Sequence, residues 1–412
     1  MPLSPARSTE SGVRRCVLAA LFLLSFVTIV DRVCISAAKG DMAAELHIPD
    51  LTFGVVFGAF ALGYALFMVP AGWTADRWGA RRFLAAIVGL WSVFTLATGL
   101  VGTVGTLIVV RFLFGASEAG AYPTAARAIH TWLPRAQRGL ALGLLNTGSR
   151  LGAAVGLSLV SAGIATIGWR ASFAVLGAVG LCWAAWWLWW YRDNPSVKPD
   201  VTSEPDRRSL VSWNSGFLLA QYFASNFTFF LCFSWLLPYL RERFGLGIHA
   251  AGIYASVPLY FGALATWTGG LAVDAIYRRG RWTLSRRLPA MLGFGLAAVT
   301  LIAVPHAHGV VAFVGCFALT TFGVDFTLSP SWSAASDLGG NRTATLSAAM
   351  NMFGSVGAFA SSVAFPWVLS ATGSSTAYFI AAAALDVAAL LMWSRINAAA
   401  ISSSSAGEAL PR

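Results

Sequence analysis

Four charged side chains interrupt apolar stretches that are long enough to cross a membrane. Asp31 and Arg32 lie in the first stretch, and Arg111 and Glu118 lie in the fourth. An ionisable group near the centre of a bilayer costs roughly 2.5–3.5 kcal/mol on insertion scales, so such residues usually pair, face a cavity and mark the path of an ion or a substrate. We therefore interpret the four residues as a transport site, with a purely structural cluster of buried ion pairs as the alternative.

The four residues are of two chemical types. Arginine stays protonated and offers a planar fork to carboxylates, so Arg32 and Arg111 are the candidates for holding an anionic substrate. Asp31 and Glu118 can lose and regain protons, so they are the candidates for carrying a coupling proton. Arg111 and Glu118 are seven residues apart, nearly two helical turns, which predicts one shared helix face and a separation of about 10.5 Å. Equal depth in helices that run in opposite directions also predicts a contact between Asp31 and Arg111.

Apolar helices must position these residues. The chain has 412 residues, of which 57% are hydrophobic and 11% charged, and its mean hydropathy of +0.69 excludes a soluble globular protein. Continuous apolar runs that contain Gly and Pro favour helices of roughly 20 residues over the alternating segments of a β-barrel. We predict an all-α membrane protein with twelve spans, at residues 16–38, 52–73, 83–103, 105–130, 139–165, 170–191, 213–240, 249–274, 287–304, 309–333, 344–368 and 374–396.

The basic residues predict the orientation of the chain. Of its 28 Lys and Arg residues, twenty fall in segments on the side of the N-terminus and four in segments on the opposite side. Cytoplasmic segments carry such an excess, so both termini are expected in the cytoplasm, and the net charge of +11 does not indicate nucleic acid. The predicted organisation is a cytoplasmic tail (1–15), a six-helix bundle (16–191), a cytoplasmic linker (192–212), a second six-helix bundle (213–396) and a cytoplasmic tail (397–412).

Two short patterns recur in both halves of the chain. One places glycine four residues before aspartate, with arginines after it: Gly72, Asp76, Arg77 and Arg81, and later Gly270, Asp274 and Arg278. The other places arginine before asparagine and glycine: Arg138, Asn146 and Gly148, and later Arg342, Asn351 and Gly354. Such repeats indicate two related halves. We expect Gly72 to permit close helix approach and Asp76 to meet arginines or a helix N-terminus, as a clasp on a cytoplasmic gate; an ordinary basic loop is the alternative.

Residues 72–82 resemble the signature of the major facilitator superfamily between its second and third spans. Motifs along nearly the whole chain resemble the anion:cation symporter family within it: Asp31-Arg32, Arg111 with Glu118, Tyr122-Pro123, Trp132 with Pro134, Gly168-Trp169-Arg170, Trp235 with Pro238, Ser329-Pro330-Ser331-Trp332, Asp337 with Gly339, and Asn351. The resemblance implies a monomer in the bacterial inner membrane that imports a small organic anion, a sugar acid or related carboxylate, by alternating access. H⁺ is the expected coupling ion, with Na⁺ as the alternative. That family often has Tyr and Gln where this chain has Ile29 and Met68, which also allows a less hydroxylated carboxylate.

The resemblance adds secondary candidates for substrate contacts. They are the residues at the family's cavity positions: Tyr64, Asn226, Ser329, Ser331, Trp332 and Asn351. Hydrogen bonds between neighbouring helices are the alternative role for each of them. Arg150 and Asp325 lie in opposite halves, and we expect either a salt bridge between them or a further anion contact from Arg150, with Asp325 as a third proton-coupling candidate. Asp386 is expected to be structural.

Other functions find less support in the sequence. A phosphate-binding Gly-x4-Gly-Lys-Ser/Thr pattern is absent, which argues against ATP-driven transport, and no catalytic constellation indicates an enzyme. Five cysteines without metal or redox spacing, and His306 and His308 without a third ligand, give no reason to expect a metal or cofactor. An antiporter that exports an anion or a drug is the alternative function, and a non-transporting nutrient receptor is a remote one.

Overall fold

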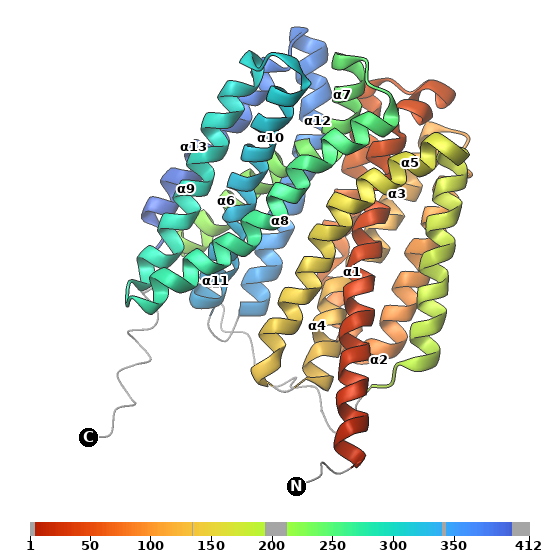
Figure 1. Cartoon of the computed structure of the whole chain (residues 1–412), viewed down its shortest axis with the longest axis vertical. Coiled ribbons are helices and arrows are strands. Elements are labelled where there is room, and N and C mark those ends of the chain that lie inside the picture. The colour runs from red at the N-terminus through yellow and green to blue at the C-terminus, as the bar shows by residue number, and fades with distance from the viewer. Residues whose placement is uncertain (1–4, 134, 194–211, 340–342, 398–412) are drawn as a thin grey trace. The chain divides into compact units, whose positions relative to one another are not determined.

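The chain is helical throughout the part that the computed structural model describes, residues 5–133, 135–193, 212–339 and 343–397, and no strand occurs in these ranges (Figure 1). The first elements are α1 (Pro5–Leu46), α2 (Asp50–Thr98), α3 (Val104–Glu118), α4 (Ala121–Trp132) and α5 (Arg135–Trp190). The later ones are α6 (Trp213–Phe230), a π-helical turn (Leu231–Trp235), α7 (Leu236–Phe244), α8 (Ile248–Arg278), α9 (Trp282–Ala303), a 3-10 turn (Val304–His306), α10 (Gly309–Phe326), α11 (Leu328–Gly339), α12 (Thr343–Thr372) and α13 (Thr376–Arg395). The predicted all-α class is confirmed.

Within the described ranges, eleven helical segments are long and apolar enough to cross a membrane. The prediction from sequence was twelve, and the difference arises at Gly168. The candidate span Thr147–Trp190 is 44 residues long, about twice one crossing, and Gly168 within it has a φ of 78° that interrupts helical geometry. Gly168 falls between the predicted spans 139–165 and 170–191. Gly79, with a φ of 77°, interrupts α2 in the same way.

The helices group into two compact units. The N-terminal unit is the chain up to Ile48 together with the chain from Leu62 to the end of α5, and the C-terminal unit is Pro49–Ala61 together with α6 and all later helices. The Phe57 ring in that short segment lies edge-on to the Trp235 ring, with centroids 5.1 Å apart. The first turns of α2 thus pack with helices that follow more than 150 residues later in the sequence.

Prolines explain where helices break inside each unit. α3 ends at Glu118, five residues before Pro123, and α4 begins at Ala121, two residues before it. Proline has no N–H to donate to the carbonyl four residues earlier, and its ring clashes with that carbonyl. The same cause separates α10 from α11, because Pro330 faces the carbonyl of Phe326, the last residue of α10. Pro238 follows the π-helical turn Leu231–Trp235, where the ladder is also disturbed.

Glycines bring α1 and α5 into close contact in the N-terminal unit. A methyl group built at Gly152 would lie 2.7 Å from the Phe26 carbonyl oxygen, and one at Gly156 would lie 2.6 Å from Val30 Cγ2. These glycines are four residues apart, so they share one face of α5. The close approach predicted for Gly72 is wrong for the described residues, since a methyl group there would meet nothing within 4 Å.

Candidate functional site

A cluster of buried charges lies inside the N-terminal unit. Glu118 at the end of α3 has no exposed surface, Asp31 on α1 is 1% exposed, and Arg111 on α3 is 3% exposed. Arg32 Nε donates to Glu118 Oε1 at 2.7 Å, and 13% of the Arg32 side chain is exposed. The four residues singled out in the sequence therefore lie close together among the helices of the N-terminal unit.

The local fold positions each group in this cluster. Arg111 and Glu118 come from one face of α3, as their spacing predicts, and the break before Pro123 places Glu118 at the end of that helix. The Arg32 guanidinium lies over the Tyr64 ring of α2, 4.8 Å from its centroid. The Arg111 guanidinium lies over the Phe114 ring of its own helix at 4.6 Å. Both cations thus have an aromatic face as well as acids beside them, which favours a desolvated cation.

Asp31 differs from its neighbour Arg32 in its contacts. Adjacent residues on a helix point about 100° apart, so Asp31 does not share the direction that takes Arg32 to Glu118. Both carboxylate oxygens of Asp31 are buried and accept no hydrogen bond from a described residue. Asp31 and Arg111 interact electrostatically, and a direct contact between them stays a prediction. The indole of Trp91 on α2 lies beside the same carboxyl group.

The polar candidates of the C-terminal unit make contacts between or within helices. Ser331 is fully buried and donates to the Thr327 carbonyl oxygen at 2.7 Å and to Gln221 Oε1 at 3.3 Å. Ser329 donates to the Thr266 carbonyl oxygen of α8 at 3.3 Å. Hydrogen bonds to neighbouring helices are the alternative to substrate contacts for such polar residues.

The remaining candidates of that unit lie on α6, α10, α11 and α12. Asn226 Nδ2 donates to the Tyr222 carbonyl oxygen of its own helix at 3.0 Å. Trp332 is 43% exposed and meets the Tyr222 ring edge-on, and Asn351 is half-buried. Asp325 is 2% exposed, and its carboxyl group packs against the main chain of Gly262 on α8.

Only some of the predicted gating residues can be placed. The side chains of Asp76, Arg138 and Arg150 lie outside the described part, as does the whole of Arg342. Gly72, Arg77 and Arg81 are on α2, and Asp274 is exposed on α8. Arg81 donates to the Leu188 carbonyl oxygen near the end of α5 through Nε and Nη2, at 3.1 and 2.8 Å. A guanidinium at the C-terminal end of a helix interacts favourably with its dipole.

Asp193, which no sequence pattern singled out, stabilises the break in α2. Asp193 Oδ1 accepts hydrogen bonds from the main-chain N–H groups of Ala80 at 3.0 Å and Arg81 at 3.3 Å, immediately after Gly79. A methyl group at Gly79 would lie 2.8 Å from the same carboxylate. An acid that caps the first free N–H groups of a helix is an ordinary N-terminal cap, but it comes from more than 110 residues away. No local signal could have identified it.

Two further polar features were not predicted, and one expected role agrees with the structure. Lys39, which directly follows the predicted span 16–38, is 3% exposed on α1. Arg286 on α9 pairs with Asp337 on α11 at 3.0 Å. Asp386 on α13 has no exposed surface, and the Thr228 hydroxyl of α6 lies 3.1 Å from both of its carboxylate oxygens. Its expected structural role agrees with that hydrogen bond.

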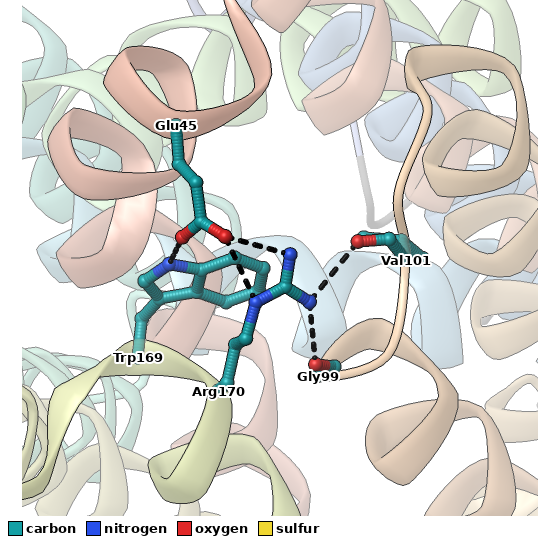
Figure 2. Close-up of polar contacts among 5 residues, drawn as sticks. All are labelled: Glu45, Gly99, Val101, Trp169 and Arg170. Carbon is teal, nitrogen blue, oxygen red and sulfur yellow. Dashed lines mark hydrogen bonds and ion pairs between the residues drawn. The ribbon is translucent and has the colours of Figure 1, made fainter.

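A second polar cluster joins the end of one helix to a loop and a helix kink within the N-terminal unit (Figure 2). Glu45, next to the end of α1, accepts from Trp169 Nε1 at 2.7 Å and from Arg170 Nη2 at 2.9 Å. Arg170 Nη1 donates to the carbonyl oxygens of Gly99 at 2.8 Å and Val101 at 3.1 Å, in the loop between α2 and α3. The Arg170 guanidinium also lies 4.2 Å from the Trp169 ring centroid. One arginine thus links α1, the α2–α3 loop and the Gly168 kink of α5.

Long apolar helices around buried charges define a multi-pass membrane transporter. A family model, the Major Facilitator Superfamily, matches residues 21–362. The chain belongs to this superfamily, as its motifs predicted, and is a transporter rather than an enzyme.

Curated relatives and solved structures extend this assignment. The probable sulfoacetate transporter SauU of Cupriavidus necator is 32% identical over 399 residues, which cover 92% of each chain. The probable galactarate/D-glucarate transporter GudP of Bacillus subtilis is 27% identical, over 93% of this chain and 92% of that protein. The structure of a bacterial homolog of the human lysosomal transporter Spinster superposes with a TM-score of 0.78 at 19% identity, over 96% of this chain and 97% of that chain. The likeness to that structure shows the fold alone.

Proposed function

We propose that this chain is a secondary active transporter that imports a small organic anion together with a proton, by alternating access. The observation that carries the proposal is the buried pair of Arg32 and Glu118, with Asp31 and Arg111 in electrostatic range. A buried guanidinium suits the carboxylate of a substrate, and a buried carboxyl group suits a proton. Burying charges in a membrane span costs free energy, so buried charges of this kind usually mark the path of an ion or a substrate.

The ion pair suggests how proton and anion would be coupled. While Glu118 is ionised, its Oε1 atom occupies Arg32 Nε at 2.7 Å. Protonation of Glu118 removes the negative charge from this pair, so the guanidinium becomes available to a substrate carboxylate. Release of the substrate and then of the proton restores the pair. Asp31, whose carboxylate oxygens accept no hydrogen bond from a described residue, is the second proton carrier in this proposal.

The names of the relatives suggest an acid with a negative group at each end. Sulfoacetate carries a sulfonate and a carboxylate, and galactarate and glucarate carry two carboxylates; these compounds are named for the relatives. Two guanidinium groups, Arg32 and Arg111, suit two such ends. Ile29 and Met68, which are 7% and 8% exposed, replace polar residues that the resembling family often has, which favours a substrate with fewer hydroxyl groups. The proposed class is therefore a small dianionic carboxylate, from sulfoacetate to the sugar diacids.

The proposal includes an arrangement in the membrane. Two six-helix bundles, residues 16–191 and 213–396, carry out the alternating access, and two spans meeting at Gly168 bring the count to twelve. The excess of basic residues on one side supports termini in the cytoplasm of a bacterium, with the chain as a monomer in the inner membrane. The Gly72–Arg81 pattern, Asp274, Arg138 and Arg342 form the clasps of the cytoplasmic gate in this arrangement.

Uptake by purified protein in proteoliposomes tests the coupling. A pH gradient, acidic outside, should drive accumulation of the labelled anion in the wild type. Glu118→Gln should abolish accumulation but retain exchange of substrate between the two sides, because the neutral amide cannot carry the proton. Full gradient-driven uptake by Glu118→Gln would reject the proton role. The direction of transport can be tested with proteoliposomes that are loaded with substrate. Uptake of labelled substrate is measured under a pH gradient of each direction, and the gradient that drives accumulation distinguishes a symporter from an exporting antiporter.

A thermal-shift screen identifies the substrate. Sulfoacetate, galactarate, D-glucarate and L-galactonate should be compared at equal concentration, with acetate as the monoanionic control. A ligand that binds only the folded state raises its apparent stability by about 2.7 kcal/mol at a concentration of 100 Kd. The dianions should stabilise the wild type and lose this effect in Arg32→Gln. Stabilisation by none of the acids would contradict the proposed class.

A further inference from the structure

We propose that a groove on the N-terminal unit binds an anionic phospholipid. The groove lies between the α2 segment on both sides of Gly79 and the last turns of α5, and its volume is about 840 Å³. Its lining has a basic end, Arg77, Trp78 and Arg82, and an apolar body of alanine and leucine side chains that includes Ala86, Ala185 and Leu188. None of the described residues that line it is acidic.

The two parts of the groove match the two parts of a phospholipid. Arg77, Trp78 and Arg82 are exposed, and Trp78 has 60% of its surface accessible. Arg82 forms no ion pair with any described residue, whereas a phosphate is a strong partner for a guanidinium. A water-soluble anion would leave the alanine and leucine walls unused, but an acyl chain covers them.

The position along the helices agrees with the level of a headgroup. Arg77 and Arg82 precede the apolar run that begins at Phe83, so the basic end lies at the edge of the apolar segment and Ala86 lies inside it. Arginine side chains reach from such positions toward the membrane surface, and tryptophan is favoured there. Basic pockets between membrane helices bind anionic headgroups by the same combination of charge and apolar contact.

Two charged side chains beside the groove, Asp193 and Arg81, make hydrogen bonds to the main chain. The Asp193 carboxylate accepts the N–H groups of Ala80 and Arg81. The Arg81 guanidinium donates to the Leu188 carbonyl oxygen, which fixes one wall of the groove. Asp193 is therefore held at the helix N-terminus, and the arginines at positions 77 and 82 are the ones that line the groove.

Native mass spectrometry of the full chain in detergent, titrated with phosphatidylglycerol or with phosphatidylcholine of the same acyl chains, tests the proposal. The wild type should bind phosphatidylglycerol more tightly. Arg82→Gln should weaken its binding roughly fivefold, since a basic residue at the surface contributes about that factor, and should leave phosphatidylcholine unchanged. Ala185→Trp fills the groove without altering charge and should weaken both lipids. Arg279→Gln, an exposed arginine of the C-terminal unit, is the matched control and should bind as the wild type does.

Three results would overturn the proposal. The first is equal affinity of the wild type for the two lipids. The second is an unchanged affinity for phosphatidylglycerol in both Arg82→Gln and Ala185→Trp. The third is displacement of the lipid by inorganic phosphate alone at millimolar concentration, which would indicate an ion site without acyl-chain binding. The measurement uses no transport substrate, so its outcome is independent of the proposed function.

Discussion

The two units break one helix in the same way but surround their buried acids with different chemistry. Glu118 lies five residues before Pro123 at the end of α3, and Asp325 lies five residues before Pro330 near the end of α10. Glu118 is ion-paired with Arg32 across helices. Asp325 packs against the main chain of a glycine on α8. Both units thus share the backbone break and the position of a buried acid five residues before the proline.

Asp386, a second buried acid of the C-terminal unit, differs from Glu118 in the kind of partner it has. Asp386 has one hydroxyl partner, Thr228, and no cation among the described residues. A charged carboxylate buried without a cation is costly, whereas a neutral group of the same size is not. Glu118 has a cation with which a proton can compete, and Asp386 has none. Under the proposed function, burial alone therefore does not distinguish a proton-coupling acid from a structural one; the partner of the acid does.

Arg32→Met is the strongest test of this difference, and we expect the largest effect from it. Removing one member of a buried ion pair leaves the other charge uncompensated, which costs about 3–5 kcal/mol of stability. Uptake should be lost and the midpoint of thermal unfolding should fall. The double variant Arg32→Met with Glu118→Gln should recover stability but not uptake. A single variant as stable as wild type would mean that the pair does not hold the unit together.

Gly152→Val tests the packing of α1 on α5. A side chain there would meet the Phe26 main chain at 2.7 Å, and overpacking of this kind costs about 1–3 kcal/mol. Gly315→Ala is the matched control, because a methyl group on that helical glycine meets nothing within 4 Å and alanine is the better helix former. Thermal unfolding should separate the two variants in opposite directions.

Thr228→Val and Asp386→Asn test the role of Asp386, the buried acid of the C-terminal unit whose hydrogen-bond partner is a hydroxyl. Loss of the hydroxyl leaves Asp386 without its hydrogen bond and should cost about 1–3 kcal/mol. Asp386→Asn keeps size and polarity, so we expect near-normal stability and gradient-driven uptake. Thr268→Val is the control, since that hydroxyl bonds within its own helix and its loss should change stability by about 0.5 kcal/mol or less. If Asp386→Asn abolished proton-coupled uptake, the contrast between the units would fail.

Glu45→Gln should have the smallest effect. Its carboxylate is partly exposed, with 48% of the side chain accessible, so solvent and salt screen its attraction to Arg170. We expect a slight fall in the unfolding midpoint that shrinks as salt is added. Arg170→Gln should have the larger effect of the two, because it also removes the bonds to the Gly99 and Val101 carbonyl oxygens (Figure 2). Equal falls in the unfolding midpoint for the two variants would mean that the ion pair alone stabilises this region and that the bonds to the two carbonyl oxygens contribute nothing.

The sequence predicted the elements better than their contacts. Apolar runs are local, so they located the spans, but the breaks near Pro123 and Pro330 fall inside the predicted spans 105–130 and 309–333 and were not predicted. The seven-residue spacing of Arg111 and Glu118 placed both on one face, because helical periodicity alone fixes that relation. Spacing within a helix could not predict which acid would meet which cation, and the structure pairs Arg32 with Glu118.

The sequence by itself determined that this chain is a helical membrane transporter with acids and arginines inside the bilayer. Composition and periodicity decide which segments leave water and which faces of a helix share a side. Only the tertiary structure decided that Asp193 caps a helix more than 110 residues earlier, that Gly152 rather than Gly72 sits at a close helix contact, and that Asp386 has a hydroxyl for a partner. These outcomes depend on how each helix is rotated about its axis and on the depth at which it packs against distant helices. No local stretch of sequence determines either quantity.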